Sequence, residues 1–346
     1  MKCNNRCCSS DTLPTNMGVA QGLCLSCLLF LIMMNDLPLC ICNSLCIKFV
    51  DDTGILISGE IGNISETVSK LESDLLNICN WMKSSRLELN NDKCEMMVIA
   101  AKKHIQYVQD ISVKLDGVPM KRVNFIKILG IIIDNDLKFN LQCDKVAEKC
   151  NFALWSLYSL KGVLDVRHKI MVVQALILPI IMYCCPIWLV GSSNLKCINN
   201  ILRRCARFVY GKSKFDSISD EIIVDLEWLN ANCCKFEMSK IAFNMYNNIG
   251  PGIFRDYICQ EKRIVRATRT VTYSEPNIIC NGLMRKSFQY RASKTVLNLP
   301  VRITEKLRNL SIIEFKRLVK CELVHEQCTE RMVELFDILD DHDALG

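Results

Sequence analysis

Two adjacent aspartates, Asp51 and Asp52, interrupt an apolar stretch and constrain how the chain around them folds. Residues 45–50 and 54–58 are β-like runs, and polar residues between such runs are typical of a tight turn. On a straight strand two adjacent side chains point to opposite faces, whereas at a hairpin tip both can point to one side. The pattern therefore predicts a strand–turn–strand unit with two carboxylates at its tip.

Helical and strand patterns alternate around this unit. Residues 23–37 predict a buried helix, and apolar residues at three- and four-residue steps predict an amphipathic helix over residues 63–84. Asp116-Gly117 separates two short apolar runs, which is a strong signal for a β-hairpin. Further strands are expected over residues 96–100 and 123–133.

Beyond residues 134–140 the patterns become helical, so the main boundary is expected there. Helices are predicted over residues 141–160, 167–183, 195–210, 219–228, 233–248, 312–324 and 326–339. The fold class is therefore α+β, with an antiparallel sheet and its helices followed by an all-helical C-terminal part.

Positive charge is concentrated in the second half of the chain. Residues 1–150 hold 16 Lys and Arg against 17 Asp and Glu, whereas residues 151–346 hold 27 against 20. A concentrated basic region is typical of proteins that bind nucleic acid. A solvated surface with chance clustering fits the same numbers.

The chain has 22 cysteines and begins with a polar segment that has no apolar signal-peptide core. Many cysteines lie in apolar runs, where free cysteine behaves as a small hydrophobe. A reducing compartment is therefore expected, the nucleus, the cytoplasm or both. Cys24 and Cys27 form a CxxC pair, but no second pair or histidine follows at zinc-finger spacing, which disfavours a metal site there.

One apolar run, residues 170–190, is long enough to cross a membrane. It contains Gln174, and Pro179 and Pro186 divide it, which favours two packed segments over one span. No membrane association is expected.

The four residues from Phe49 to Asp52 resemble the aromatic-x-Asp-Asp sequence that forms the third palm motif of reverse transcriptases. Residues 18–22, Gly-Val-Ala-Gln-Gly, resemble the second palm motif of LINE-type (non-LTR) retrotransposons. Leu-Leu-Phe at residues 28–30 and Asn-Asp-Leu-Pro at residues 35–38 follow as in that family. Each motif alone is weak, but their order and spacing together are specific.

Later segments extend the resemblance to about residues 16–320. Residues 86–93, Arg-Leu-Glu-Leu-Asn-Asn-Asp-Lys, resemble the fourth palm motif, which follows a helix that carries a tryptophan, here Trp81. Residues 128–131, Ile-Leu-Gly-Ile, resemble the primer-gripping hairpin. The later helices, with Tyr183 and Trp188, resemble the thumb and C-terminal region of jockey-like elements.

The resemblance implies an RNA-directed DNA polymerase of a mobile element, active in its transposition. Its partners are an RNA template, a DNA primer end and dNTP, and its cofactor is Mg²⁺. Residues 1–138 correspond to a partial palm, residues 139–215 to a helical thumb, and residues 216–346 to a helical, basic C-terminal region. The oligomeric state is not indicated.

The same resemblance assigns the polymerase chemistry. Asp51 is the main Mg²⁺ ligand and Asp52 the supporting carboxylate in two-metal nucleotidyl transfer. Lys93 lies near the triphosphate, where it neutralises or protonates the leaving pyrophosphate. Without the family, a plain turn and a solvated lysine are the simpler readings of these residues.

Other residues are assigned to binding. Gly18 and Gly22 let the backbone approach template and nucleotide closely, and Gln21 contacts the nascent base pair. Phe49 is assigned to the same nucleotide site. Leu129 and Gly130 shape the primer grip. Phosphate contacts are expected from the basic residues of one later helix, Arg203, Arg204 and Arg207, for which a solvated helix face is the alternative.

The largest departure concerns the first palm motif, which carries a third metal-binding aspartate on an apolar strand. Among the first 15 residues the only acidic one is Asp11, and its surroundings are not an apolar strand. We therefore expect an N-terminally truncated fragment, without fingers or first palm motif, that is inactive alone. The alternatives are a non-catalytic nucleic-acid-binding remnant of a mobile element and, less favoured, a membrane protein.

Overall fold

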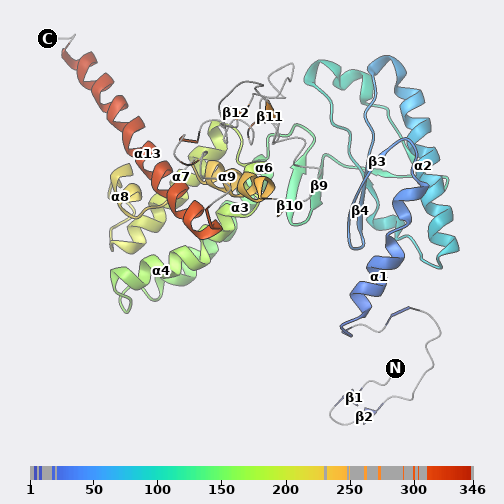
Figure 1. The fold of residues 1–346 in the computed structure, drawn as a ribbon, viewed down its shortest axis with the longest axis horizontal. Helices are drawn as coiled ribbons and strands as arrows, with labels where there is room; N and C mark the ends of the chain where they lie inside the picture. The colour runs from blue at the N-terminus through green and yellow to red at the C-terminus, as the bar shows by residue number, and fades with distance from the viewer. Residues whose placement is uncertain are drawn as a thin grey trace. The chain divides into compact units, whose positions relative to one another are not determined.

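In a computed structural model the chain forms two compact units, Met1–Ile126 and Lys127–Gly346 (Figure 1). The structure describes residues 4–5, 8–9, 18–19, 22–229, 232–247, 249, 261–262, 272–273, 291, 299–300, 303 and 310–343. The division between the units falls earlier than the expected palm–thumb boundary after residue 138. The assignment of residues to palm, thumb and C-terminal region stays a prediction.

Unit 1 combines helices with short strands, as the α+β fold class requires. Its α-helices are α1 (Ser26–Met34) and α2 (Ile64–Ser84). Its short 3-10 helices are η1 (Leu37–Cys40), η2 (Ile61–Asn63), η3 (Asn91–Lys93) and η4 (Lys102–Val108). Its strands are β1 (Asn4–Asn5), β2 (Cys8–Ser9), β3 (Leu45–Phe49), β4 (Asp52–Leu56), β5 (Glu95–Met96), β6 (Lys114–Leu115), β7 (Val118–Pro119) and β8 (Lys121–Arg122).

The core of unit 1 lies along one side of α2. Leu75, Ile78 and Cys79 of this helix are buried together with Met34 of α1 and Leu37 of η1. These α2 positions recur at helical spacing, so the amphipathic pattern over residues 63–84 is confirmed. Packing of this apolar stripe stabilises α2, because most of the stability of a helix in a protein comes from tertiary packing.

The strands of the described segments pair only two by two. β3 pairs antiparallel with β4, from Leu45 opposite Leu56 to Phe49 opposite Asp52, which confirms the predicted strand–turn–strand unit. β6 pairs with β7 around Asp116 and Gly117, whose φ angles of 50° and 82° fit the predicted hairpin turn. β5 pairs parallel with β8, so these strands form separate ribbons in place of one antiparallel sheet.

Two strand predictions are corrected. The strand expected over residues 96–100 is reduced to β5. The strand expected over residues 123–133 is broken into β9 (Phe125–Ile128) and β10 (Ile131–Asp134), because Leu129 and Gly130 form a tight turn between them.

Unit 2 is mostly helical. Its helices are α3 (Asn140–Tyr158), α4 (Val166–Leu176), α5 (Leu178–Met182), α6 (Cys185–Trp188), α7 (Ser192–Val209), α8 (Asp220–Asp225), α9 (Cys233–Tyr246) and α13 (Ile312–Asp343). β11 (Glu261–Lys262) and β12 (Thr272–Tyr273) form a further short ribbon. The core runs from Ile131 of β10 through α3, α5 and α7, with Trp188 and Phe208 fully buried. Phe243 of α9 stacks on Phe315 of α13 at a ring-centroid distance of 4.3 Å.

Two helix predictions change in unit 2. The helix expected over residues 167–183 is split into α4 and α5, and Pro179 stands in the first turn of α5. The two helices expected over residues 312–339 are one continuous helix, α13. Most of residues 255–302, a basic segment of this half of the chain, lie outside the described residues.

The apolar run over residues 170–190 follows the division expected from its prolines. It contributes to α4, α5 and α6 in succession, and Pro186 stands in the first turn of α6. Across the described part of the chain, every helix is too short or too polar to cross a membrane.

Candidate functional site

The two aspartates lie at the tip of the β3–β4 hairpin, where Val50 and Asp51 form a two-residue turn. Val50 has a φ of 58°. A positive φ at this turn position favours glycine, and a β-branched residue there is strained. Strain of this kind costs on the order of 1–3 kcal/mol and is retained where the surrounding structure fixes it, often at functional sites.

Both carboxylates are exposed at this tip. Within the described segments, neither side chain takes part in a hydrogen bond or ion pair. The Thr53 hydroxyl donates to the backbone oxygen of Asp51 at 3.4 Å, so this contact does not use a carboxylate oxygen. Two adjacent carboxylates with free oxygens match the donor set of a hard divalent cation, so the residues present fit Mg²⁺.

Asp74 of α2 fixes the segment that leads into β3, and sequence reasoning missed it. Its side chain is fully buried, and it accepts hydrogen bonds from the backbone N–H groups of Cys42 at 3.0 Å and Asn43 at 2.9 Å. Burial raises the pKa of Asp74, but these hydrogen bonds outweigh burial and hold it below its ordinary value. The available signal was an acidic residue on the apolar side of α2, one position before Leu75.

A lysine joins the hairpin to α1. The ammonium of Lys48 donates a hydrogen bond to the backbone oxygen of Met34, at the end of that helix. Lys48 alternates with Phe49 along β3, so it lies on the covered face while Phe49 is 60% exposed. The phenyl ring is thus presented on the same hairpin as the two carboxylates.

The glycines of the predicted nucleotide-binding segment have backbone conformations that favour glycine. Gly18 has a φ of 83° and Gly22 a φ of 89°, and both are exposed. An added Cβ would meet no atom within 4 Å at either position, so backbone conformation rather than space calls for glycine. Gln21 lies outside the described residues.

Lys93 is the last residue of η3 and is exposed. It belongs to unit 1, as the carboxylates do, but lies on a separate turn that precedes β5. The structure thus brings Asp51, Asp52 and Phe49 together on one hairpin, whereas Lys93 is presented from another element. Its role at the triphosphate stays a prediction.

The predicted primer-grip residues form the turn between β9 and β10. Leu129 and Gly130 have φ angles of 47° and 86°, and two positive angles in succession are typical of a type I′ turn. The Tyr183 hydroxyl donates a hydrogen bond to the backbone oxygen of Leu129 at 2.7 Å. The indole N–H of the buried Trp188 donates to the backbone oxygen of Tyr183 at 2.9 Å, which connects the turn to the helical core.

The three arginines expected to contact phosphates all lie on α7, and all have partners inside the protein. Arg204 donates to the Asn151 side-chain oxygen at 2.8 Å, and Arg207 donates to the backbone oxygen of Asp216 at 2.9 Å. Arg203 also interacts within the chain. Arg204 is exposed, while Arg203 and Arg207 are half-buried, so phosphate binding by this helix stays a prediction.

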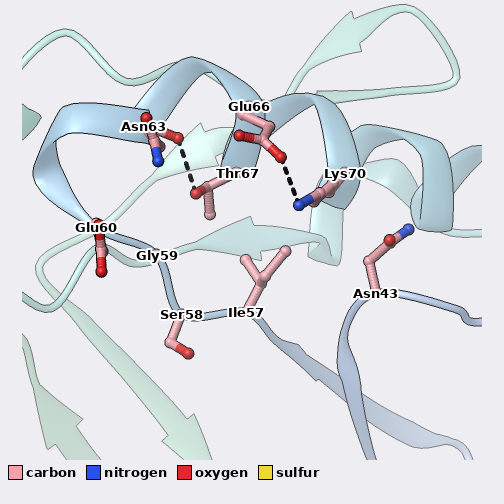
Figure 2. Close-up of a pocket in the computed structure, with 9 residues that line it drawn as sticks. All are labelled: Asn43, Ile57, Ser58, Gly59, Glu60, Asn63, Glu66, Thr67 and Lys70. Carbon is pink, nitrogen blue, oxygen red and sulfur yellow. Dashed lines mark hydrogen bonds and ion pairs between the residues drawn. The ribbon is translucent and has the colours of Figure 1, made fainter.

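A shallow pocket of about 320 Å³ lies elsewhere in unit 1, between the end of β4 and the start of α2 (Figure 2). Two of its charged side chains, Lys70 and Glu66, form an ion pair at 2.7 Å. The Thr67 hydroxyl donates to the Asn63 backbone oxygen at 3.0 Å. Its lining contains neither Asp51 nor Asp52, so it is not part of the carboxylate site.

Comparison with known proteins shows what the segment around the two carboxylates is similar to. A search of curated proteins finds no significant match to the chain. Residues 2–133 match the family model described as reverse transcriptase (RNA-dependent DNA polymerase). The match includes the β3–β4 hairpin, η3 and the β9–β10 turn, so the segment that carries the paired aspartates is similar to a reverse transcriptase domain.

Proposed function

We propose that this chain carries palm carboxylates of the RNA-directed DNA polymerase of a LINE-type, jockey-like non-LTR retrotransposon. The observation that carries the proposal is the strained hairpin tip at Val50, which presents Asp51 and Asp52 with carboxylate oxygens that have no partner among the described residues. That tip lies inside the segment that matches the reverse transcriptase family. The order of motifs from residue 18 to residue 131 supports the non-LTR type.

The proposed polymerase site is centred on the tip of the β3–β4 hairpin. Asp51 and Asp52 would hold Mg²⁺, which when bound activates the attacking primer hydroxyl and stabilises the leaving pyrophosphate. Phe49 presents an exposed ring beside the carboxylates for contact with the nucleotide. Lys93 would supply positive charge toward the triphosphate, and Gly18 and Gly22 would let the backbone approach the template and the incoming base. Gln21 would contact the nascent base pair.

The 346 residues supply two of the three carboxylates expected of such a site. Two protein ligands hold Mg²⁺ weakly, because the ion keeps most of its water. We therefore propose that a polypeptide of only these residues does not extend a primer. Sequencing the 5′ end of the transcript shows whether a third ligand is encoded, since a reading frame that continues upstream into an apolar strand with an aspartate would supply it.

Primer extension on an RNA template with Mg²⁺ and dNTP is the direct assay. If the transcript encodes a third carboxylate, the polypeptide of that reading frame should extend the primer, and Asp51→Asn should abolish extension. Asp110→Asn, which changes an exposed carboxylate in a different turn, is the matched control and should keep activity. Extension that survives Asp51→Asn would contradict the site assignment.

The same assay tests the 346-residue chain. Strong Mg²⁺-dependent extension by this polypeptide alone, abolished by Asp51→Ala, would overturn its proposed inactivity. It would leave the assignment of Asp51 intact, so the two parts of the proposal fail separately.

A second candidate function is binding of nucleic acid without catalysis. The excess of Lys and Arg over residues 151–346 favours it. Filter binding of RNA at increasing salt measures it, since binding through phosphates weakens steeply with salt. Salt-sensitive binding that is unchanged by Asp51→Ala, in a protein without polymerase activity, would support this function.

Residence in the nucleus, the cytoplasm or both is also part of the proposal. All cysteines whose side chains the structure describes are free. Free cysteines in such number suit a reducing compartment. Fractionation of cells that express the tagged chain would test this assignment.

A further inference from the structure

Three cysteines from two helices meet in the core of unit 2. Cys185 is the first residue of α6, and Cys233 and Cys234 are the first two residues of α9. Their side chains are 0%, 1% and 4% exposed, and the three Sγ atoms lie within 4.8 Å of one another. α6 contacts α9, so the sulfurs converge where these two helices meet.

This convergence goes beyond the packing of buried cysteines as small hydrophobes. Cys150 and Cys205 are also fully buried, but no group of three ligands forms around them among the described side chains. Of the side chains that the structure describes, only Cys185, Cys233 and Cys234 make a group of three with metal-binding spacing. Residues 185 and 233 are far apart in the sequence, so no short spacing motif marks the site.

The distances suit a thiophilic cation. Zn–S bonds are about 2.3 Å long, so sulfurs at tetrahedral angles around one ion lie about 3.8 Å apart. Sulfurs that already lie within 4.8 Å need to approach by about 1 Å or less. Cys233 and Cys234 also stand in the first turn of a 14-residue helix, where backbone N–H groups and the helix dipole stabilise thiolates.

A nearby arginine provides the balancing charge. Arg291 donates a hydrogen bond to the backbone oxygen of Pro186 at 2.8 Å and another to the Cys234 sulfur. A buried charge needs a partner of opposite sign, and here the guanidinium is that partner.

We propose that Cys185, Cys233 and Cys234 form a structural metal site that binds Zn²⁺ and joins α6 to α9. Thiolates select soft or borderline cations over hard Mg²⁺. With Zn²⁺ the three thiolates carry a single negative charge, which Arg291 balances, whereas with Cu⁺ they would carry two. Each thiol releases its proton to solvent as the ion binds, and the fourth tetrahedral position takes a donor from outside these three residues.

The ion would stabilise the part of unit 2 that supports the primer-grip turn. Cys185 lies two residues after Tyr183, whose hydroxyl donates a hydrogen bond to the backbone oxygen of Leu129. Structural zinc contributes directly to folding free energy, so its removal should lower thermal stability. The site is distinct from the carboxylates of unit 1, and its test does not depend on polymerase activity.

The first experiment measures metal content. The 346-residue chain is expressed in zinc-supplemented medium, purified under reducing conditions without chelator, and analysed for zinc and copper by plasma mass spectrometry. We expect zinc equimolar with protein, most of it lost in Cys185→Ser and Cys234→Ser. Cys205→Ser, a change of an equally buried cysteine outside the site, should keep its zinc. A strong chelator should lower the Tm, and added Zn²⁺, but not Mg²⁺, should restore it.

Cobalt substitution tests the site without any variant that might misfold. Co²⁺ added to the metal-free wild-type chain should give a thiolate-to-cobalt charge-transfer band and the intense ligand-field bands of tetrahedral coordination. Protein without zinc and with all three thiols free, a disulfide among them, or zinc retained in both variants would overturn the proposal. Copper bound in place of zinc would overturn the charge argument for Zn²⁺.

Discussion

The Tyr183 hydroxyl donates a hydrogen bond to the backbone oxygen of Leu129 at 2.7 Å and so holds the β9–β10 turn from a distant segment. Leu129 has a φ of 47°, a conformation that costs a non-glycine residue energy. The ring of Tyr183 also lies 3.8 Å from where a Cβ on Gly130 would stand. One side chain therefore fixes both residues of the predicted primer grip.

Removal of this hydroxyl should loosen the turn. Tyr183→Phe loses one hydrogen bond, worth about 1 kcal/mol at most because the side chain is 52% exposed. We expect the backbone amides of residues 129–131 to exchange with solvent up to about fivefold faster, as measured by hydrogen exchange. Tyr158→Phe is the matched control, because no hydrogen bond to the Tyr158 hydroxyl occurs within the described residues. Equal exchange in both variants would contradict the role of Tyr183.

The strain at Val50 predicts opposite effects of two glycine substitutions on β3 and its turn. Val50→Gly removes strain of about 1–3 kcal/mol at the cost of about 0.5–1 kcal/mol of chain entropy. The hairpin should therefore be as stable or more stable. Ile47→Gly, at an exposed position within the same strand, relieves no strain and should destabilise the hairpin by about 1 kcal/mol. Native-state hydrogen exchange of the β3 and β4 amides measures both, and destabilisation by Val50→Gly would show that the positive φ stores no strain.

Asp74 should make unit 1 sensitive to acid. Its carboxylate accepts hydrogen bonds from two backbone N–H groups, so Asp74→Asn should lower the free energy of unfolding by about 2 kcal/mol at neutral pH. Because the pKa of Asp74 is held below its ordinary value of 3.8, the ionised form contributes its full stability above that value. The contribution is lost as pH falls through the depressed pKa in the folded protein.

Urea unfolding of wild-type and Asp74→Asn protein, from neutral pH down through the acid range, measures this contribution. The difference between the two proteins should shrink only below the ordinary pKa. Asp110→Asn, at an exposed position, should leave stability unchanged at every pH. A difference that stays constant into strong acid would show that ionisation of Asp74 is not the cause.

Local patterns predicted the parts of the structure that depend on neighbouring residues. The turn at Asp51, the amphipathic helix α2 and the hairpin at Asp116 and Gly117 follow from spacing and turn chemistry, and all three are confirmed. The prediction of a continuous strand over residues 123–133 was wrong, because the apolar sequence continues through a turn at Leu129. This turn needs a positive φ, which leucine rarely adopts.

Features that depend on distant residues escaped sequence analysis. Asp74 binds the segment before β3 through backbone N–H groups, and no side-chain pattern marks such partners. The three clustered cysteines come from segments nearly fifty residues apart and meet only when α6 packs on α9. The arginines of α7 gave a charge signal, but their intramolecular partners depend on how the helices pack.

We propose above that the tip of the β3–β4 hairpin binds a divalent cation through Asp51 and Asp52. Mn²⁺ replaces Mg²⁺ in oxygen-ligand sites and loses its free-ion electron paramagnetic resonance signal when bound, so titration of the 346-residue chain with Mn²⁺ measures the site directly. We predict weak binding that Asp51→Asn and Asp52→Asn each reduce several-fold and that Asp110→Asn leaves unchanged. Mn²⁺ binding of equal affinity in all four proteins would contradict the claim.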